Sequence, residues 1–234
     1  MEKKEKVFGI GFSKTGTTSL EQALTILGYN VCKGRQDLKH NDYLAALYVN
    51  KAYDEIYRLT KYWNAFADGP WGGSDLYKKL YEWYPDAKFI LTIRDPESWY
   101  NSYIRMVTKF TENRDLENAW DDFHAHGRYG SVYFFKHVFQ IGTLAGNKDK
   151  IIGYFEKTNN DIKAFFKEKR NFLELNIIGG EGWEKLCDFL SHEIPQVDFP
   201  DVNKSVQNKN KRKKPHVPLR KRIKRRLINI ADRL

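Results

Sequence analysis

The fourteen residues from Val7 to Leu20, VFGIGFSKTGTTSL, constrain the fold of this chain more than any other stretch. Apolar residues suited to a short buried strand come first, and Gly11 and Gly16 then let the backbone turn and approach a ligand closely. Three hydroxyl residues at 17–19 open a segment with apolar residues at helical spacing. A strand, a glycine-containing loop and a helix in this order point backbone N–H groups and a positive dipole end at one spot. The stretch therefore predicts an anion site, with the charge of Lys14 beside it.

The two glycines have the spacing of the phosphate loop of nucleotide hydrolases, G-x-x-x-x-G-K-[ST], but the lysine is displaced. Thr17 follows the second glycine, where that loop has its lysine, and Lys14 lies two residues before this glycine instead. A nucleoside triphosphatase also needs an acidic Mg²⁺ ligand after another strand, and we identify no clear candidate for it. The loop is therefore predicted to hold phosphate-like groups without the usual lysine and Mg²⁺ chemistry at a γ-phosphate.

A second strand–turn–helix unit follows later in the chain. The apolar run Lys88–Ile93, KFILTI, is typical of a strand that is buried on both faces, and Arg94 lies at its C-terminal end. A helix is expected from Ser98, with Pro96 near its start. Further helices are expected at 42–62, 75–84, 129–141, 150–166 and 183–190, strands at 29–32 and 172–177, and an aromatic-rich loop at 64–74.

The alternation of strands and helices predicts the fold class. We expect an α/β fold of three layers, with a mainly parallel sheet flanked by helices, like that of the P-loop nucleoside triphosphatases. Ligands of such sheets bind at the carboxyl ends of the strands. The loops at 11–19 and 94–102 should therefore meet at the same edge of the sheet.

The positive net charge of +10 belongs to the end of the chain. From Lys204 onward there are 13 Lys or Arg residues and a single acid, so residues 1–203 are close to neutral. We predict one domain at 1–203 and a basic tail at 204–234. The tail is expected to be partly disordered, and residues 219–234 can form an amphipathic helix.

The chain shows no signal for export or membrane insertion. It contains no apolar run of about 18 residues, and its charged N-terminus lacks the apolar core of a signal peptide. The two cysteines, Cys32 and Cys187, are far apart in the sequence and are predicted to be free and buried. We therefore expect a cytoplasmic protein, with the tail as a means of peripheral attachment to a membrane.

Three stretches together resemble sulfotransferases that use 3′-phosphoadenosine-5′-phosphosulfate (PAPS) as the donor. The motif GFSKTGTTS at 11–19 resembles their 5′-phosphosulfate loop, in which a GTT core follows a basic residue. The motif RDPESWYNS at 94–102 is similar to their 3′-phosphate site, in which a serine follows the arginine by eight residues. Residues 173–203, with a GW and an FP…N motif, are similar to the C-terminal part of the small soluble branch of the family. The resemblance covers roughly residues 7–203.

The resemblance also implies roles for the matching residues. Backbone N–H groups and hydroxyls of the first loop would hold the 5′-phosphate, and Lys14 would stabilise the charge on the bridging oxygen as the sulfonate leaves. Arg94 suits a phosphate because its planar fork can donate two hydrogen bonds. The implied donor-binding set is Ser13, Lys14, Thr15, Gly16, Thr17, Thr18, Ser19, Arg94 and Ser102. The product would be adenosine 3′,5′-bisphosphate, and no metal is expected, since no cluster has the spacing of metal ligands.

An acceptor hydroxyl also needs a general base, for which the family uses a histidine or a carboxylate. Asp68 is our candidate, because it lies in the Gly/Pro/Trp-rich loop between the two motif units. His124, His126 and Asp75 are weaker candidates. We therefore predict Lys14 and Asp68 as the catalytic residues.

These observations predict a sulfotransferase that moves a sulfonate from PAPS to a hydroxyl, or less readily to an amine, of a small-molecule, glycan or lipid acceptor. A basic amphipathic helix at 219–234 could bind an anionic membrane surface. Nucleic-acid binding is disfavoured, because the tail has no aromatic residues on which bases could stack. Two alternatives stay open: a nucleotide or small-molecule kinase on the same scaffold, and a non-catalytic nucleotide-binding module that the tail tethers to membranes.

Overall fold

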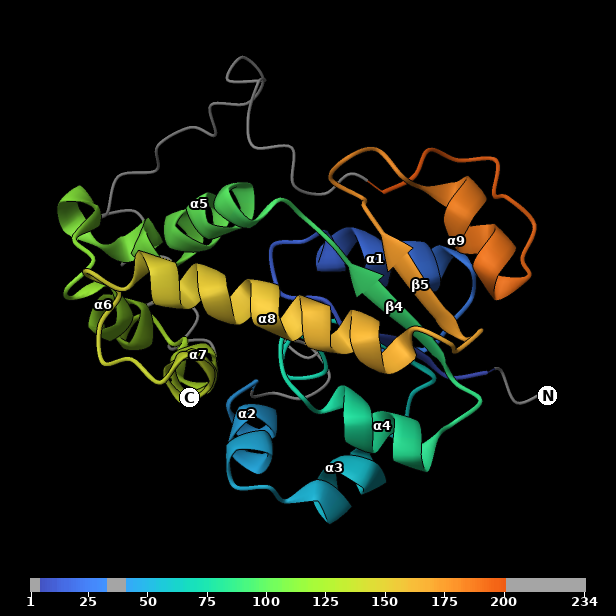
Figure 1. Ribbon diagram of the computed structural model, residues 1–234, viewed down its shortest axis with the longest axis horizontal. Helices are drawn as coiled ribbons and strands as arrows, with labels where there is room; N and C mark the ends of the chain where they lie inside the picture. Colours follow the sequence, from blue (N-terminus) through green and yellow to red (C-terminus); the bar gives the residue numbers. More distant parts are fainter. Residues whose placement is uncertain (1–4, 33–40, 201–234) are drawn as a thin grey trace, which may run out of the picture. The chain divides into compact units, whose positions relative to one another are not determined.

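The computed structural model describes residues 5–32 and 41–200. Five strands form one sheet in the order β2-β3-β1-β4-β5, and all four neighbouring pairs are parallel. Figure 1 shows the last of these pairs, β4 and β5, side by side. The strands are β1 (Val7–Gly9), β2 (Val31–Cys32), β3 (Ala65–Phe66), β4 (Lys88–Thr92) and β5 (Phe172–Leu175). The predicted α/β fold with a parallel sheet flanked by helices is confirmed. The tail predicted from residue 204 onward, with its helix at 219–234, lies outside the described residues.

Helices connect and cover the strands. They are α1 (Thr17–Ile26), α2 (Asn41–Val49), α3 (Tyr53–Leu59), α4 (Tyr77–Trp83), α5 (Pro96–Val107), α6 (Ala119–Ala125), α7 (Tyr129–Phe139), α8 (Lys148–Phe166) and α9 (Trp183–Leu190), with short 3₁₀ turns η1 (Thr108–Phe110) and η2 (Glu112–Arg114). None of the helices in the described residues is long and apolar enough to cross a membrane.

Two predicted boundaries were wrong. The single helix expected at 42–62 is two helices, because the chain turns sharply at Lys51, which has a positive φ of 56°. The segment 64–74, expected to be a loop throughout, begins with the two-residue strand β3, which is too short to show any periodicity. This strand matters for function, because it pairs directly with β1.

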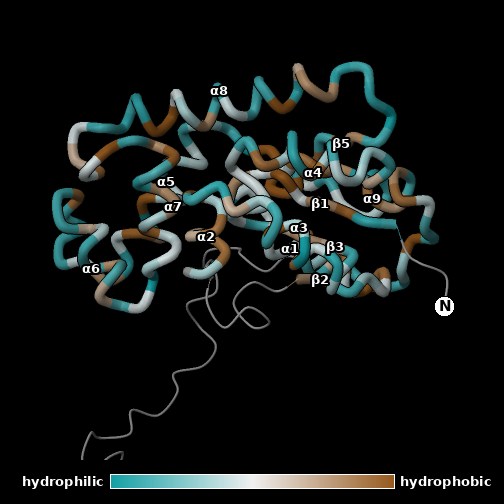
Figure 2. The backbone as a smooth tube through the Cα atoms, turned by 90° about the horizontal axis from the view of Figure 1, so that it is seen from below, coloured by the Kyte–Doolittle hydropathy of each residue, from teal (hydrophilic) through white to brown (hydrophobic). Residues whose placement is uncertain are grey.

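The sheet separates two apolar layers, because alternate residues of a strand point to opposite faces. Val7 and Ile90 pack with α1 and α9 on one face. Phe8 and Phe89 pack with α4, α5 and α8 on the other face, where their rings are stacked with centroids 5.5 Å apart. β1, whose apolar colouring is visible in Figure 2, contributes side chains to both layers. Cys32 and Cys187 are buried thiols, as predicted, and both contribute to these layers.

Candidate active site

The strand order brings three predicted segments to one edge of the sheet. The loop with Lys14 follows β1, and β1 lies between β3 and β4. Asp68 follows β3, and Arg94 follows β4. Because parallel strands end at the same edge, the lysine, the carboxylate and the arginine leave three adjacent strand ends. This order explains why residues 26 to 80 positions apart in the sequence can serve one site.

The loop after β1 passes so close to β4 that only glycine fits at position 11. A Cβ on Gly11 would lie 2.1 Å from Thr92 Oγ1 and 2.5 Å from the Thr92 carbonyl oxygen. Gly16 ends the loop in a left-handed conformation with φ of 107°, which residues with a side chain rarely adopt. Lys14 also has a positive φ, of 73°, although it is not a glycine. The loop is therefore held in one conformation by its surroundings.

Thr15 holds the loop from inside. Its side chain is fully buried, and Oγ1 donates a 2.5 Å hydrogen bond to the Phe12 carbonyl oxygen. The same oxygen lies 2.6 Å from Thr92 Oγ1, which ties the loop to β4. The Thr15 N–H also donates to the Phe12 carbonyl, at 3.3 Å. Both donors of Thr15 bind groups of the protein and position the loop, and the contact of Thr15 with the cofactor stays a prediction.

The first turn of α1 presents the features of an anion site. Thr17, Thr18 and Ser19 occupy this turn, and the N-cap residue Gly16 has no side chain that could accept a hydrogen bond from its N–H groups. The turn contains no acidic residue either. The first N–H groups of a helix have no partner within the helix, and the dipole makes this end positive. Thr18 is half-buried, whereas Thr17 and Ser19 are buried.

The second motif is bound directly to the first. Arg94 Nη1 donates a 2.9 Å hydrogen bond to the Lys14 carbonyl oxygen, and Arg94 Nε and Nη2 donate to Ser98 Oγ at 3.0 and 2.9 Å. One turn into α5, the indole N–H of Trp99 donates to the Ser13 carbonyl oxygen at 3.0 Å. The predicted meeting of the two loops is therefore observed, through side chains of one and carbonyl groups of the other.

The first turn of α5 stabilises the contact between the two loops. Asp95 is the N-cap, and its carboxylate accepts a 2.8 Å hydrogen bond from the Ser98 N–H, with Pro96 in the first turn. Ser102, the second predicted residue of this unit, lies one turn further and is 9% exposed. Partial burial lowers the pKa of the Arg94 guanidinium, and repulsion from Arg105 lowers it further, while Asp95 opposes the shift. Arginine stays charged at neutral pH even so.

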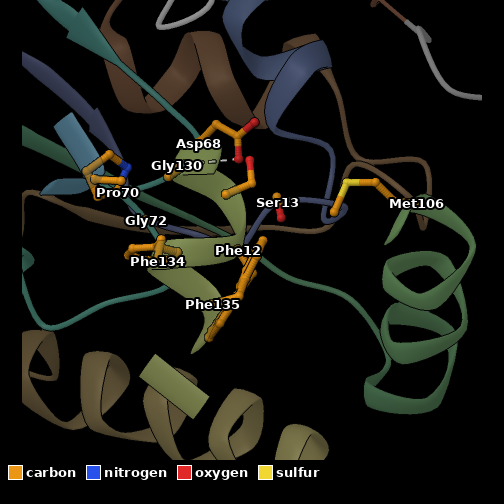
Figure 3. Close-up of a pocket in the computed structure, with 12 residues that line it drawn as sticks. Phe12, Ser13, Asp68, Pro70, Gly72, Met106, Gly130, Phe134 and Phe135 are labelled. Atoms are coloured by element: carbon orange, nitrogen blue, oxygen red, sulfur yellow. Dashed lines mark hydrogen bonds between the residues drawn. The ribbon is translucent and has the colours of Figure 1, made fainter. Parts of the chain in front are cut away.

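Asp68 and the first loop line one cavity of about 60 Å³ (Figure 3). Asp68 has a positive φ of 68°, and its carboxylate accepts a 2.9 Å hydrogen bond from the Gly69 N–H. Apolar side chains from α5 and α7 form much of the remaining wall; the lining residues are Phe12, Ser13, Ala45, Asp68, Gly69, Pro70, Gly72, Met106, Gly130, Ser131, Phe134 and Phe135. The cavity thus combines a carboxylate with several apolar side chains.

The loop that carries Asp68 is docked on the loop that carries Lys14. A Cβ on Gly72 would lie 2.0 Å from the Gly11 carbonyl oxygen, so the two backbones are in direct contact. The Gly73 N–H donates to the Ile10 carbonyl oxygen at 3.3 Å. The position of Asp68 relative to the first loop is therefore determined by backbone contacts.

The other candidates for a general base lie elsewhere. His124 is exposed on α6, and His126 is exposed directly after this helix; the ring of His126 stacks on Phe110 with centroids 4.2 Å apart, and neither histidine lines the cavity. Asp75 accepts a 2.8 Å hydrogen bond from the Tyr48 hydroxyl and lines a separate cleft between α7 and α8. In the described part of the chain, no group of three or more His, Cys, Asp or Glu residues could hold a metal ion.

Sequence analysis missed several residues that shape this site. Ser98 binds Arg94 with two hydrogen bonds, and its position four residues after the arginine was the available signal. Trp99 anchors the first loop and stacks on Phe155, with ring centroids 4.1 Å apart. The cavity wall from Met106, Phe134 and Phe135 could not be found from periodicity, because buried aromatic residues on helices usually belong to a core.

This fold and this edge of the sheet define an α/β protein of the P-loop-like class, in which the start of α1 has the features expected of an anion site. Residues 6–208 match the family model described as "Sulfotransferase domain", and the chain belongs to this family. It is also similar to "Ava biosynthesis cluster protein M" of Aspergillus versicolor, with 26% identity over 227 residues that cover 87% of this chain and 82% of the relative. The sulfotransferase resemblance seen in the sequence motifs is therefore confirmed at the level of the family.

Proposed function

We propose that this protein transfers a sulfonate group from PAPS to the hydroxyl group of a small-molecule acceptor. The observation that carries the proposal is the hydrogen bond from Arg94 to the Lys14 carbonyl, which joins the two predicted phosphate-binding units into one site. A donor with a phosphosulfate at one end and a 3′-phosphate at the other needs two anion sites at a fixed separation. The membership of the sulfotransferase family supports the same reaction.

The first turn of α1 would hold the 5′-phosphate of the donor, with N–H groups and hydroxyls of Thr17, Thr18 and Ser19. Lys14 would stabilise the charge that develops on the bridging oxygen. Arg94 and Ser102 would bind the 3′-phosphate. In the transfer step the bond between sulfur and the bridging oxygen breaks, and sulfur bonds to the acceptor oxygen. The products are the sulfated acceptor and adenosine 3′,5′-bisphosphate.

Asp68 would act as the general base that takes the proton of the acceptor hydroxyl. Its carboxylate lies in the same cavity as Ser13, the residue next to Lys14. A cavity of about 60 Å³ has room for the reacting end of an acceptor only, so the rest of the molecule must extend outward. The apolar walls formed by Met106 and Phe134 favour a hydroxyl carried on an apolar or aromatic body.

The relative supports a small-molecule acceptor, because its name places that protein in a biosynthesis cluster. An amine is a less suitable acceptor, since it is protonated at neutral pH and must lose a proton before it can attack. We place the reaction in the cytoplasm, and binding of residues 219–234 to an anionic membrane surface would bring the enzyme to lipid-soluble acceptors.

Calorimetry tests the donor assignment and separates the alternatives. The wild-type chain should bind adenosine 3′,5′-bisphosphate in the presence of a metal chelator, and ATP with Mg²⁺ should not compete effectively. Binding of ATP with Mg²⁺ in place of the bisphosphate would refute the proposal and favour a kinase. Arg170, which is exposed near the opposite edge of the sheet, offers a control: Arg170→Ala should bind like the wild type.

Turnover tests the catalytic assignment. Lys14→Ala should keep bisphosphate affinity within a few-fold of the wild type and should lose on the order of 100- to 1,000-fold in the rate of bisphosphate release from PAPS with acceptor present. If Lys14→Ala retained the full biological activity of the protein, a non-catalytic nucleotide-binding module would be the better interpretation.

A further inference from the structure

Arg105 lies on the same face of α5 as the two serines of the second motif. Ser98, Ser102 and Arg105 are spaced four and three residues apart, which aligns them along one stripe of an α-helix. Ser98 is bound to Arg94, so this stripe begins at the proposed 3′-phosphate site. Helical side chains lean toward the N-terminus of their helix. The long side chain of Arg105 is therefore directed back over the turn that carries Ser102.

The charges around this stripe are unbalanced. Partial burial and, after it, repulsion from Arg105 lower the pKa of Arg94. Neither arginine forms an ion pair with an acid among residues 5–32 and 41–200. The carboxylate of Asp95, which acts on Arg94, is bound as the helix N-cap to the Ser98 N–H. Two guanidinium groups that repel each other and form no ion pair are typical of a site for an anion.

Arg94 alone does not match the charge of a phosphate monoester. Such a group carries between about −1.5 and −2 at neutral pH. Arg94 has five N–H donors, and three of its hydrogen bonds already go to Lys14 and Ser98. Two donors and one positive charge remain for the ligand, so a second cation is needed to balance the dianion.

We propose that Arg105 supplies this second cation and binds the 3′-phosphate of the donor together with Arg94 and Ser102. This inference rests on the proposed function, because it concerns a subsite of the proposed donor site. It assigns Arg105 to the part of the nucleotide that distinguishes PAPS from adenosine 5′-phosphosulfate. Arg105 is thus a specificity-determining residue for the donor and takes no part in the transfer of the sulfonate.

Two nucleotides that differ only in the 3′-phosphate give the test. Adenosine 3′,5′-bisphosphate and adenosine 5′-monophosphate are titrated into the full-length wild type, Arg105→Ala, Arg105→Lys and the control Arg170→Ala. Arg105→Ala should weaken bisphosphate binding about tenfold, the loss expected for one partly exposed charge-assisted hydrogen bond, and leave monophosphate binding unchanged. Arg105→Lys should restore part of the affinity. The affinity for the bisphosphate should also depend less steeply on salt in Arg105→Ala.

The outcomes separate this inference from the proposed function. If the wild type does not bind the bisphosphate at all, the proposed function fails. If the wild type binds it and Arg105→Ala binds it equally well, or loses affinity for both nucleotides alike, the role of Arg105 is refuted. A merely structural role would lower the melting temperature of the ligand-free protein, whereas removal of one of two repelling charges should leave it unchanged or raise it slightly.

Discussion

Substitutions of the two threonines in the Thr15–Thr92 contact are expected to destabilise the protein by different amounts. Thr15 Oγ1 bonds both the Phe12 carbonyl oxygen, at 2.5 Å, and Thr92 Oγ1, at 2.6 Å, and both threonines are fully buried. In Thr15→Val the Thr92 hydroxyl loses the partner that the structure shows, while the Phe12 carbonyl keeps the Thr15 N–H. In Thr92→Val the Thr15 hydroxyl keeps the Phe12 carbonyl. The two substitutions therefore remove the same side-chain contact but leave different groups unsatisfied.

The magnitudes follow from this difference. Thr15→Val loses two hydrogen bonds worth about 1 kcal/mol each and leaves a buried hydroxyl unpaired at a cost of about 1–3 kcal/mol, so a destabilisation of about 3–5 kcal/mol is expected. Thr92→Val should cost only about 1 kcal/mol. The double variant should cost less than the sum of the two, because no orphaned hydroxyl remains at either position.

Urea unfolding of the wild type, both single variants and the double variant measures these values as a double-mutant cycle. Additive effects within about 0.5 kcal/mol, or equal effects of the two single substitutions, would show that the Thr15–Thr92 contact does not hold the loop as we argue. Calorimetry on Thr15→Val adds a functional readout, since a loosened loop should also bind adenosine 3′,5′-bisphosphate more weakly.

Three further predictions concern the loop, the base and the core. Gly11→Ala should destabilise the protein by more than about 3 kcal/mol in urea, because its Cβ would lie 2.1 Å from Thr92 Oγ1; a loss below about 1 kcal/mol would contradict this packing. Asp68→Asn should lower kcat about 10²- to 10⁴-fold and leave bisphosphate affinity unchanged, whereas unchanged kcat would exclude Asp68 as the base. Burial raises the pKa of Tyr77 and of Tyr154 to about 12. The unfolded chain then loses these protons first, near pH 10, so stability to urea should fall as the pH rises from about 10 to 12, and less steeply in Tyr154→Phe.

The meeting of the two motif loops was predictable from the parallel direction of the strands. The apolar run before Arg94 and the one before Gly11 identified two parallel strands, and parallel strands end at one edge. The proximity of Lys14 and Arg94 followed from that rule. The direct hydrogen bond between the Arg94 side chain and the Lys14 carbonyl did not, because periodicity describes faces of elements and carries no information on which atoms of two loops touch.

The position of Asp68 in space could not be predicted from the sequence. The residue was chosen for its place between two motifs, yet its position in space depends on β3, a strand of two residues with no recognisable pattern. Because β3 pairs with β1, Asp68 leaves the sheet beside the first loop. The burial of the Thr15 hydroxyl could not be predicted either, because a sequence motif does not show which of its hydroxyls bind groups of the protein.

The conformation of Lys14 links the two halves of the proposed donor site. A left-handed backbone costs a residue with a side chain roughly 1–2 kcal/mol, and such strain persists only where the surroundings hold it. Here the Arg94 guanidinium binds the Lys14 carbonyl and the Trp99 indole binds the carbonyl of the preceding residue, so α5 holds the loop of β1 in this shape. A 3′-phosphate that orders Arg94 would therefore also fix Lys14. Occupation of the 3′-phosphate site would thus prepare the lysine for the sulfonate transfer, and a donor without a 3′-phosphate should lose rate as well as affinity.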